Sequence, residues 1–192
     1  SPRLRKSLLV VSAVAALGAG TAVAVLSRGG REVTTDSAEA YEAYQQGREA
    51  ERRLYSKDAL ASYAKALELD PHFTLATVRL AGIVAGRDRD RAKSLVQCAA
   101  RNHGPLNPRE QLTLEIVSAD VLERDQKKVG TLVREYVRRF PDDPEGYFRL
   151  AGILAREGKA EETLATYERL VALDPNQAVA YNYLGYWFIG RH

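Results

Sequence analysis

Metal binding or nucleophilic catalysis would have to come from the few histidines and the one cysteine of the chain. His72, His103 and His192 are far apart, and no two of them have the spacing that puts metal ligands on one helix face. Cys98 is the only cysteine, which excludes an internal disulfide and a zinc site built from cysteines. Its neighbours in 95–100 are mostly apolar and helix-forming, so we expect a buried cysteine and no metal site.

Carboxylates and loops that could act on a substrate are equally scarce. The acidic pairs Glu161–Glu162 and Asp142–Asp143 stand at expected helix starts, where negative charge favours the helix dipole. The sequence has no glycine-rich phosphate loop after a strand and no serine placed as in a nucleophile elbow. We therefore expect no catalytic residues and no cofactor in these 192 residues.

The excess positive charge of the chain is concentrated at its N-terminus. The 28 basic and 25 acidic residues leave a formal net charge of +3. Arg3, Arg5 and Lys6 precede the first acidic residue. The rest of the chain contains 25 basic and 25 acidic residues. A balanced body attracts no phosphate backbone, so nucleic acid is not an expected partner.

Residues 7–26 carry no charge and are predicted to form a transmembrane helix. Twenty residues match the length that a helix needs to cross the hydrocarbon core of a bilayer. The alternative is a cleaved signal peptide, with residues 1–6 as its basic flank and 22–24 as the cleavage site. Basic residues favour the side before the span slightly, which predicts a single-pass membrane protein with an extracytoplasmic, periplasmic body. Residues 27–36 form a polar linker.

The sequence after this linker has features that recur at a regular spacing. Pro71, Pro105, Pro141 and Pro175 are separated by 34, 36 and 34 residues, and no alternating strand pattern lies between them. Three of the prolines are followed at the same distance by a pair of one large and one small residue: Leu80–Ala81, Leu150–Ala151 and Leu184–Gly185. An aromatic residue stands eight positions before two of them, as Tyr63 and Tyr167. Such a period indicates a protein built from repeated helix pairs.

The pattern resembles the tetratricopeptide repeat (TPR) family over about residues 38–192. The resemblance rests on Gly47, Tyr63 and Pro71 in the first copy, and on Tyr147, Tyr167 and Pro175 in a later one. It implies an all-α solenoid of antiparallel helix pairs in a domain of residues 37–192, behind the one transmembrane helix. The expected helices are 38–52 with 57–69, 73–85 with 89–101, 109–123 with 126–139, 144–156 with 160–172, and an unpaired 176–190. Small residues at Gly47, Ala81, Ala151 and Gly185 let paired helices approach closely.

The resemblance also implies a function. In such arrays the first helix of each pair lines a concave groove that binds protein or peptide partners. By register, this places seven residues on or near the groove: Tyr44, Arg48, Arg52, Phe148, Arg156, Asn182 and Tyr186. The lysine and asparagine with which chaperone-binding members hold acidic tails are not evident, since Tyr44 and Arg48 stand there. The expected function is a membrane-anchored scaffold for protein–protein interactions.

A second interpretation stays open. A span followed by such repeats is similar to bacterial Ser/Thr kinases of the eukaryotic type, in which a catalytic domain precedes the span and the repeats act as an input or docking region. On this interpretation the chain is a fragment of a signalling protein. The last helix, 176–190, has too many large apolar residues for one buried face, so we expect further repeats after His192.

Overall fold

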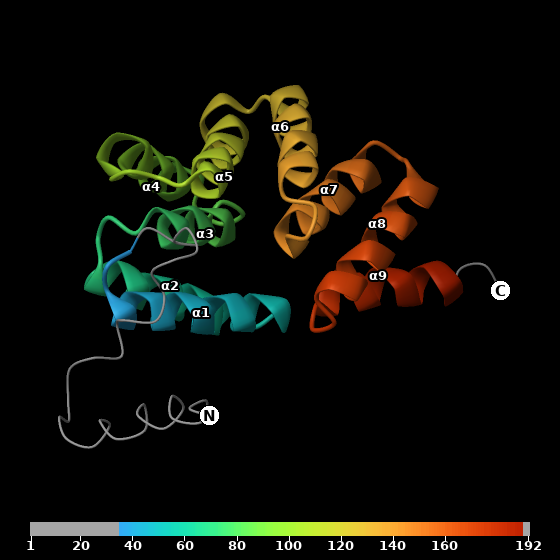
Figure 1. Ribbon diagram of the computed structural model, residues 1–192, viewed down its shortest axis with the longest axis horizontal. Coiled ribbons are helices and arrows are strands. Elements are labelled where there is room, and N and C mark those ends of the chain that lie inside the picture. The colour runs from blue at the N-terminus through green and yellow to red at the C-terminus, as the bar shows by residue number, and fades with distance from the viewer. Residues whose placement is uncertain (1–34, 190–192) are drawn as a thin grey trace, which may run out of the picture. The chain divides into compact units, whose positions relative to one another are not determined.

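A computed structural model describes residues 35–189, and all described regular structure is helical (Figure 1). The elements are α1 (Ala38–Arg52), α2 (Ser56–Leu69), α3 (Thr74–Val84), α4 (Arg89–Asn102), α5 (Pro108–Ser118), the π-helical turn η1 (Ala119–Glu123), α6 (Gln126–Arg139), α7 (Pro144–Arg156), α8 (Ala160–Leu173) and α9 (Ala178–Ile189). These bounds lie within two residues of the predicted ones, apart from the division of 109–123 into α5 and η1. The all-α prediction is confirmed for the described residues.

Consecutive helices form hairpins that pack in chain order. Contacts join α1 with α2, α3 with α4, α5 with α6, and α7 with α8, while α2 with α3, α6 with α7, and α8 with α9 connect neighbouring hairpins. The order is visible along the colour gradient of Figure 1. This is the stacked arrangement of helix pairs that the proline spacing predicted, and residues 35–189 lie within one compact unit.

The apolar core is a series of clusters and has no single centre. One cluster runs from α1 to η1, with Tyr63, Phe73 and Val96 almost fully buried. A second joins α5, α6 and α7 around Ile116 and Val133, and a third joins α7, α8 and α9. Each hairpin therefore buries its apolar side against the next one, as expected for a stacked repeat.

The first hairpin shows why the small residue of the repeat matters. A Cβ built on Gly47 would lie 2.5 Å from Cε1 of Tyr63, so the ring of Tyr63 occupies the space of the missing side chain. The Tyr44 ring packs against Tyr63 at a centroid distance of 5.7 Å and against Phe73 at 5.0 Å. Gly47 thus allows α1 and α2 to approach, and the aromatic rings connect this hairpin to α3.

The middle of the chain departs from a uniform repeat. Asn107 and Glu110 form a capping box at the start of α5, which lets the longer segment 103–107 end in a defined helix start. At the other end α5 continues into η1, whose wider turns end at Arg124 with a left-handed φ of 59°. The third hairpin therefore differs from the others in having a capping box at its start and a π-helical turn at the end of its first helix.

Two sequence predictions need correction or restriction. The predicted location, a single-pass membrane protein with an extracytoplasmic body, is corrected because the described residues contain no helix that is both long and apolar enough to cross a bilayer. Their longest helix has 15 residues, against the roughly 20 required. The predicted span itself, residues 7–26, and its flanks at 1–6 and 27–34 lie outside the described residues.

The prediction for Cys98 is wrong, because its side chain is exposed. The buried residues of α4 are Ala92, Val96 and Ala99, which follow one another at intervals of four and three. Cys98 lies off that face, and the amide of Asn102 approaches its sulfur at 3.4 Å. Apolar neighbours in the sequence did not indicate on which face of the helix the residue lies.

Helix α9 packs on α8 through only part of its surface. The Tyr183 ring lies 4.5 Å from that of Tyr167, while Tyr181, Tyr186, Phe188 and Ile189 are exposed. A Cβ on Gly185 would meet nothing within 4 Å, so the close approach predicted at this position is absent among the described residues.

Candidate functional site

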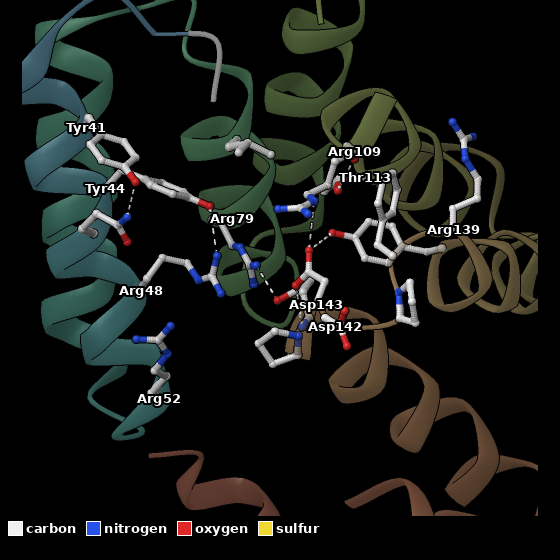
Figure 2. Close-up of a pocket in the computed structure, with 17 residues that line it drawn as sticks. Tyr41, Tyr44, Arg48, Arg52, Arg79, Arg109, Thr113, Arg139, Asp142 and Asp143 are labelled. Atoms are coloured by element: carbon white, nitrogen blue, oxygen red, sulfur yellow. Dashed lines mark hydrogen bonds and ion pairs between the residues drawn. The ribbon is translucent and has the colours of Figure 1, made fainter. Parts of the chain in front are cut away.

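A cavity of about 600 Å³ lies between α1, α3, α5 and the segment from α6 to the start of α7 (Figure 2). Its lining is rich in arginine and aromatic side chains. The charged lining residues are Arg48, Arg52, Arg79, Arg109, Arg139, Asp142, Asp143 and Glu145. Five cations thus face three carboxylates, which makes the cavity positive although the body of the chain is balanced.

Helix α1 presents three of the lining side chains at intervals of four residues. Tyr44, Arg48 and Arg52 therefore stand one above the other on a single helix face. Figure 2 shows Arg48 and Arg52 extending from α1 towards the cavity, with Arg79 from α3 beside them. The regular geometry of α1 is sufficient to place the three residues together.

A buried ion pair crosses the site from α3 to α7. Nη2 of Arg79 contacts Oε2 of Glu145, and the two side chains are only 10% and 8% exposed. Arg79 also lies 3.5 Å from Oε2 of Glu51, and Nε of Arg149 lies 2.7 Å from Oε1 of Glu145. Burial alone would raise the pKa of Glu145, but the neighbouring guanidinium groups outweigh it and hold this pKa well below its ordinary value of 4.5.

Arg48 stands in the same cluster without a carboxylate of its own. Its Nη1 donates to the hydroxyl of Tyr44 at 3.3 Å, and no carboxylate among the described residues forms an ion pair with it. The positive charge of Arg79 and burial both lower the pKa of Arg48, but the interactions with Tyr44 and Glu145 outweigh them and raise this pKa above its ordinary value. The guanidinium therefore remains charged at neutral pH.

Arg52 connects α1 to the end of α8. Its Nε lies 2.9 Å from Oδ2 of Asp174, whose side chain is 10% exposed, and its Nη1 lies 3.3 Å from Glu49. On the far side of this cluster is a second cavity of about 190 Å³. Arg48, Arg52, Arg79 and Glu145 line both cavities and so form the partition between them.

Aromatic rings and a third arginine form the opposite end of the larger cavity. Nε of Arg109 lies 3.2 Å from Oδ2 of Asp143, which also accepts a 2.6 Å hydrogen bond from the hydroxyl of Tyr136. Burial and the carboxylate of Asp143 raise the pKa of Tyr136 well above its ordinary value, so this phenol stays a donor. The guanidinium of Arg109 covers the Phe140 ring at 5.2 Å. This end of the cavity is thus fixed by its own contacts.

The structure brings together some of the predicted groove residues and not others. Tyr44, Arg48 and Arg52 line the larger cavity, and Phe148, which is 37% exposed, lines the smaller one. Arg156, Asn182 and Tyr186 are exposed and line neither cavity.

Sequence reasoning missed the other arginines of the cavity and the carboxylates opposite them. One signal could have found Arg79, because it stands eight residues after Pro71 just as Arg149 stands eight after Pro141. Both arginines contact Glu145. No comparable signal marks Glu145 itself, since its role depends on α3 and α7 lying close together.

The lining of the site is rich in groups that can bind a ligand. In the described part of the chain, no three His, Cys, Asp or Glu side chains are grouped so that they could hold a metal ion. The arginine guanidinium groups and tyrosine hydroxyls of the cavity are hydrogen-bond donors, and the raised pKa values of Arg48 and Tyr136 keep these two side chains protonated at neutral pH. What the arrangement can do chemically is to bind acceptor groups, in particular anionic ones.

Comparisons with known proteins found similar structures but no matching sequence family. No protein-family model and no curated protein matches the chain. Among solved structures, that of YrrB, described as a TPR protein with an unusual peptide-binding site, is 24% identical over 76% of this chain and 78% of that chain, with a TM-score of 0.37. A MamA double mutant (RS-1) is 15% identical over 82% of this chain and 87% of that chain, with a TM-score of 0.41. The AMB-1 MamA is 17% identical over 80% and 84%, with a TM-score of 0.37.

Proposed function

We propose that this chain is a TPR-type scaffold that binds an extended segment of a partner protein in the larger cavity. The observation that carries the proposal is the convergence of five arginines with several aromatic rings on a cavity of about 600 Å³. That volume lies within the range of about 300–1,000 Å³ typical of small-molecule pockets, so the cavity has room for several side chains of a partner. Arginine and tyrosine are also the residue types that contribute most to protein interfaces.

Two further features support a peptide over a small metabolite. Helices α1, α3, α5 and α7 all contribute to the cavity, so that a chain lying across them meets donors from successive hairpins. The guanidinium groups of Arg48 and Arg52 follow one another along α1, as consecutive contacts to an extended backbone require. The alternative, that the repeats are the docking region of a larger kinase or similar regulator, stays a prediction from the sequence.

The experiment is a selection of binding peptides on the immobilised full chain from a random dodecamer display library. Selected peptides are synthesised, and their affinity is measured by isothermal titration calorimetry. We expect the double variant Arg48→Ala with Arg52→Ala to lose at least about 30-fold in affinity, which corresponds to the roughly 2 kcal/mol of one hot-spot residue.

The matched control removes two arginines that lie outside both cavities. Arg101→Ala with Arg138→Ala changes two exposed residues of α4 and α6 and the net charge by the same amount. Circular dichroism and urea unfolding verify that each variant is folded. Equal affinity of the two double variants, or a chain that selects no peptide at all, would contradict the proposed function.

A further inference from the structure

Two ion pairs join hairpins that are not neighbours in the chain. Arg79 of the second hairpin contacts Glu145 of the fourth, and Nε of Arg52 in the first hairpin lies 2.9 Å from Oδ2 of Asp174, which directly follows α8. In a stacked repeat each unit contacts only the units next to it. The two pairs therefore depart from the repeat, and they bring the end of α1 to the turn between α8 and α9 (Figure 1).

Apolar contacts connect the same parts of the chain by a different route. The first apolar cluster includes residues from α1 to η1, the second joins α5, α6 and α7, and the third joins α7, α8 and α9. We call α1–α4 the N-terminal arm and α7–α9 the C-terminal arm. No cluster of the described residues contains members of both arms. The third hairpin, α5 with α6, is therefore the apolar connection between them.

Where the two arms meet directly, the apolar side chains surround a cavity. The smaller cavity of about 190 Å³ is lined by Leu54 and Ile83 from the side of the N-terminal arm, and by Phe148 and Val179 from the C-terminal arm. Ile83 packs against the first apolar cluster and Val179 against the third, and these clusters are separate. The ion pairs therefore hold the arms together with little apolar packing to assist them.

An interface held by charges opens more readily than a packed apolar one. Arg79 and Glu145 are 10% and 8% exposed, so their burial carries a desolvation cost that is recovered when the arms separate and water reaches them. This recovery offsets part of the attraction that is lost on opening. Arg52 is 28% exposed, and its pair with Asp174 is open to screening by salt.

We propose that the Arg79–Glu145 and Arg52–Asp174 pairs form a latch that holds the two arms closed, and that the chain opens by bending at the third hairpin. Arg52, Arg79 and Glu145 line both cavities, so the latch is also the partition between them. Opening it joins the two cavities into one longer groove. The use of this groove by a partner rests on the proposed function, whereas the latch itself does not.

The test measures the distance between two spin labels on the full chain by double electron–electron resonance. The labels are placed on the exposed positions Ala61→Cys of α2 and Glu168→Cys of α8, with Cys98→Ser to remove the native thiol. Raising the salt concentration from about 10 mM to about 1 M shortens the Debye length from about 30 Å to about 3 Å. We expect the mean distance to grow by more than about 2 Å, the scale of a domain rearrangement.

A second label pair is the control for general loosening. Ala61→Cys with the native Cys98 places both labels on the N-terminal arm, since Cys98 is exposed on α4. This distance should stay the same at all salt concentrations. The salt series leaves both ion pairs of the latch intact, so it requires no variant of the latch.

A variant of the latch gives an independent measurement. Arg52→Gln with Glu145→Gln removes one charge from each ion pair and leaves the net charge unchanged. We expect the label pair across the two arms to have its long distance already at low salt. The matched control is Asp90→Asn with Lys93→Gln, which removes an exposed ion pair within α4 and should keep the short distance. Circular dichroism verifies that each variant is folded, and the salt series decides the question if the latch variant is not.

The outcomes separate the latch from the proposed function. A distance between the arms that changes neither with salt nor in the latch variant would overturn the latch, and so would an equal change in the control label pair. A selected peptide should lengthen the distance between the arms at low salt. A peptide that binds without doing so would overturn the use of the joined groove and leave the latch standing. A chain that selects no peptide would overturn the proposed function, while the label distances still decide the latch.

Discussion

Arg79 on α3 and Glu145 on α7 form a buried ion pair although 66 residues separate them in the sequence. The two helices belong to the second and the fourth hairpin, so the pair reaches past the intervening hairpin across the wall of the larger cavity. It therefore connects the two sides of the site.

We expect Glu145→Gln to lower the free energy of unfolding by about 3 kcal/mol, since it leaves the guanidinium of Arg79 buried with only Glu51 nearby. Urea unfolding followed by circular dichroism measures the change. The control is Glu135→Gln, which breaks the half-exposed pair with Arg139 and should cost less than about 1 kcal/mol. Equal losses in the two variants would show that burial of the Arg79–Glu145 pair adds nothing.

The same carboxylate predicts how stability depends on pH. The folded-state pKa of Glu145 lies below its ordinary value of 4.5, so the unfolded chain binds a proton first as the pH falls. Its contribution to stability is complete above the unfolded pKa and is lost as the pH falls below it towards the folded pKa. Between pH 5 and pH 3 we expect the wild type to lose stability more steeply than Glu145→Gln. Parallel pH profiles of urea midpoints would contradict this assignment.

Glycine substitutions test the close approach of the first hairpin. We expect Gly47→Ala to destabilise the chain by about 1–3 kcal/mol, because the added methyl overlaps the ring of Tyr63. Gly82→Ala in α3 is the matched control, since a Cβ there meets nothing within 4 Å and alanine is the better helix former by about 0.5–1 kcal/mol. Thermal unfolding should therefore shift in opposite directions for the two variants. A stabilising Gly47→Ala would show that α1 and α2 are further apart than described.

Cys98 offers a chemical test of the register of α4. Because its side chain is exposed, the native chain should react with a thiol reagent such as dithiobis(nitrobenzoate) and release one equivalent of chromophore without denaturant. The variant Cys98→Ser should release none, and its stability should stay within about 0.5 kcal/mol of the wild type, as for other surface changes. Reaction only after urea is added would mean that Cys98 is buried, as the sequence had suggested.

The sequence was sufficient for the helices and for part of the site. Prolines at a fixed period marked where each second helix ends, and small residues such as Gly47 marked where two helices meet, because both effects are local in the chain. Tyr44, Arg48 and Arg52 could be placed together since one helix turn separates each from the next. These are properties of single helices and of neighbouring hairpins.

What sequence reasoning missed depends on contacts between distant hairpins. Sequence reasoning did not single out Glu145, because only the approach of α3 to α7 makes it the partner of Arg79. Arg156, Asn182 and Tyr186 were assigned by register, yet register does not determine which hairpins surround the cavity. Cys98 was misplaced because its apolar neighbours lie on the other face of α4.

The most direct test of the binding site is a two-dimensional NMR titration of the ¹⁵N-labelled full chain with a selected peptide. We expect the Nε–H signals of Arg48 and Arg79 and the backbone amides around 44–52 to shift, while the signals of Arg138 on the exposed side of α6 stay in place. Shifts confined to the exposed aromatic residues of α9, with Arg48 and Arg79 unchanged, would contradict the account.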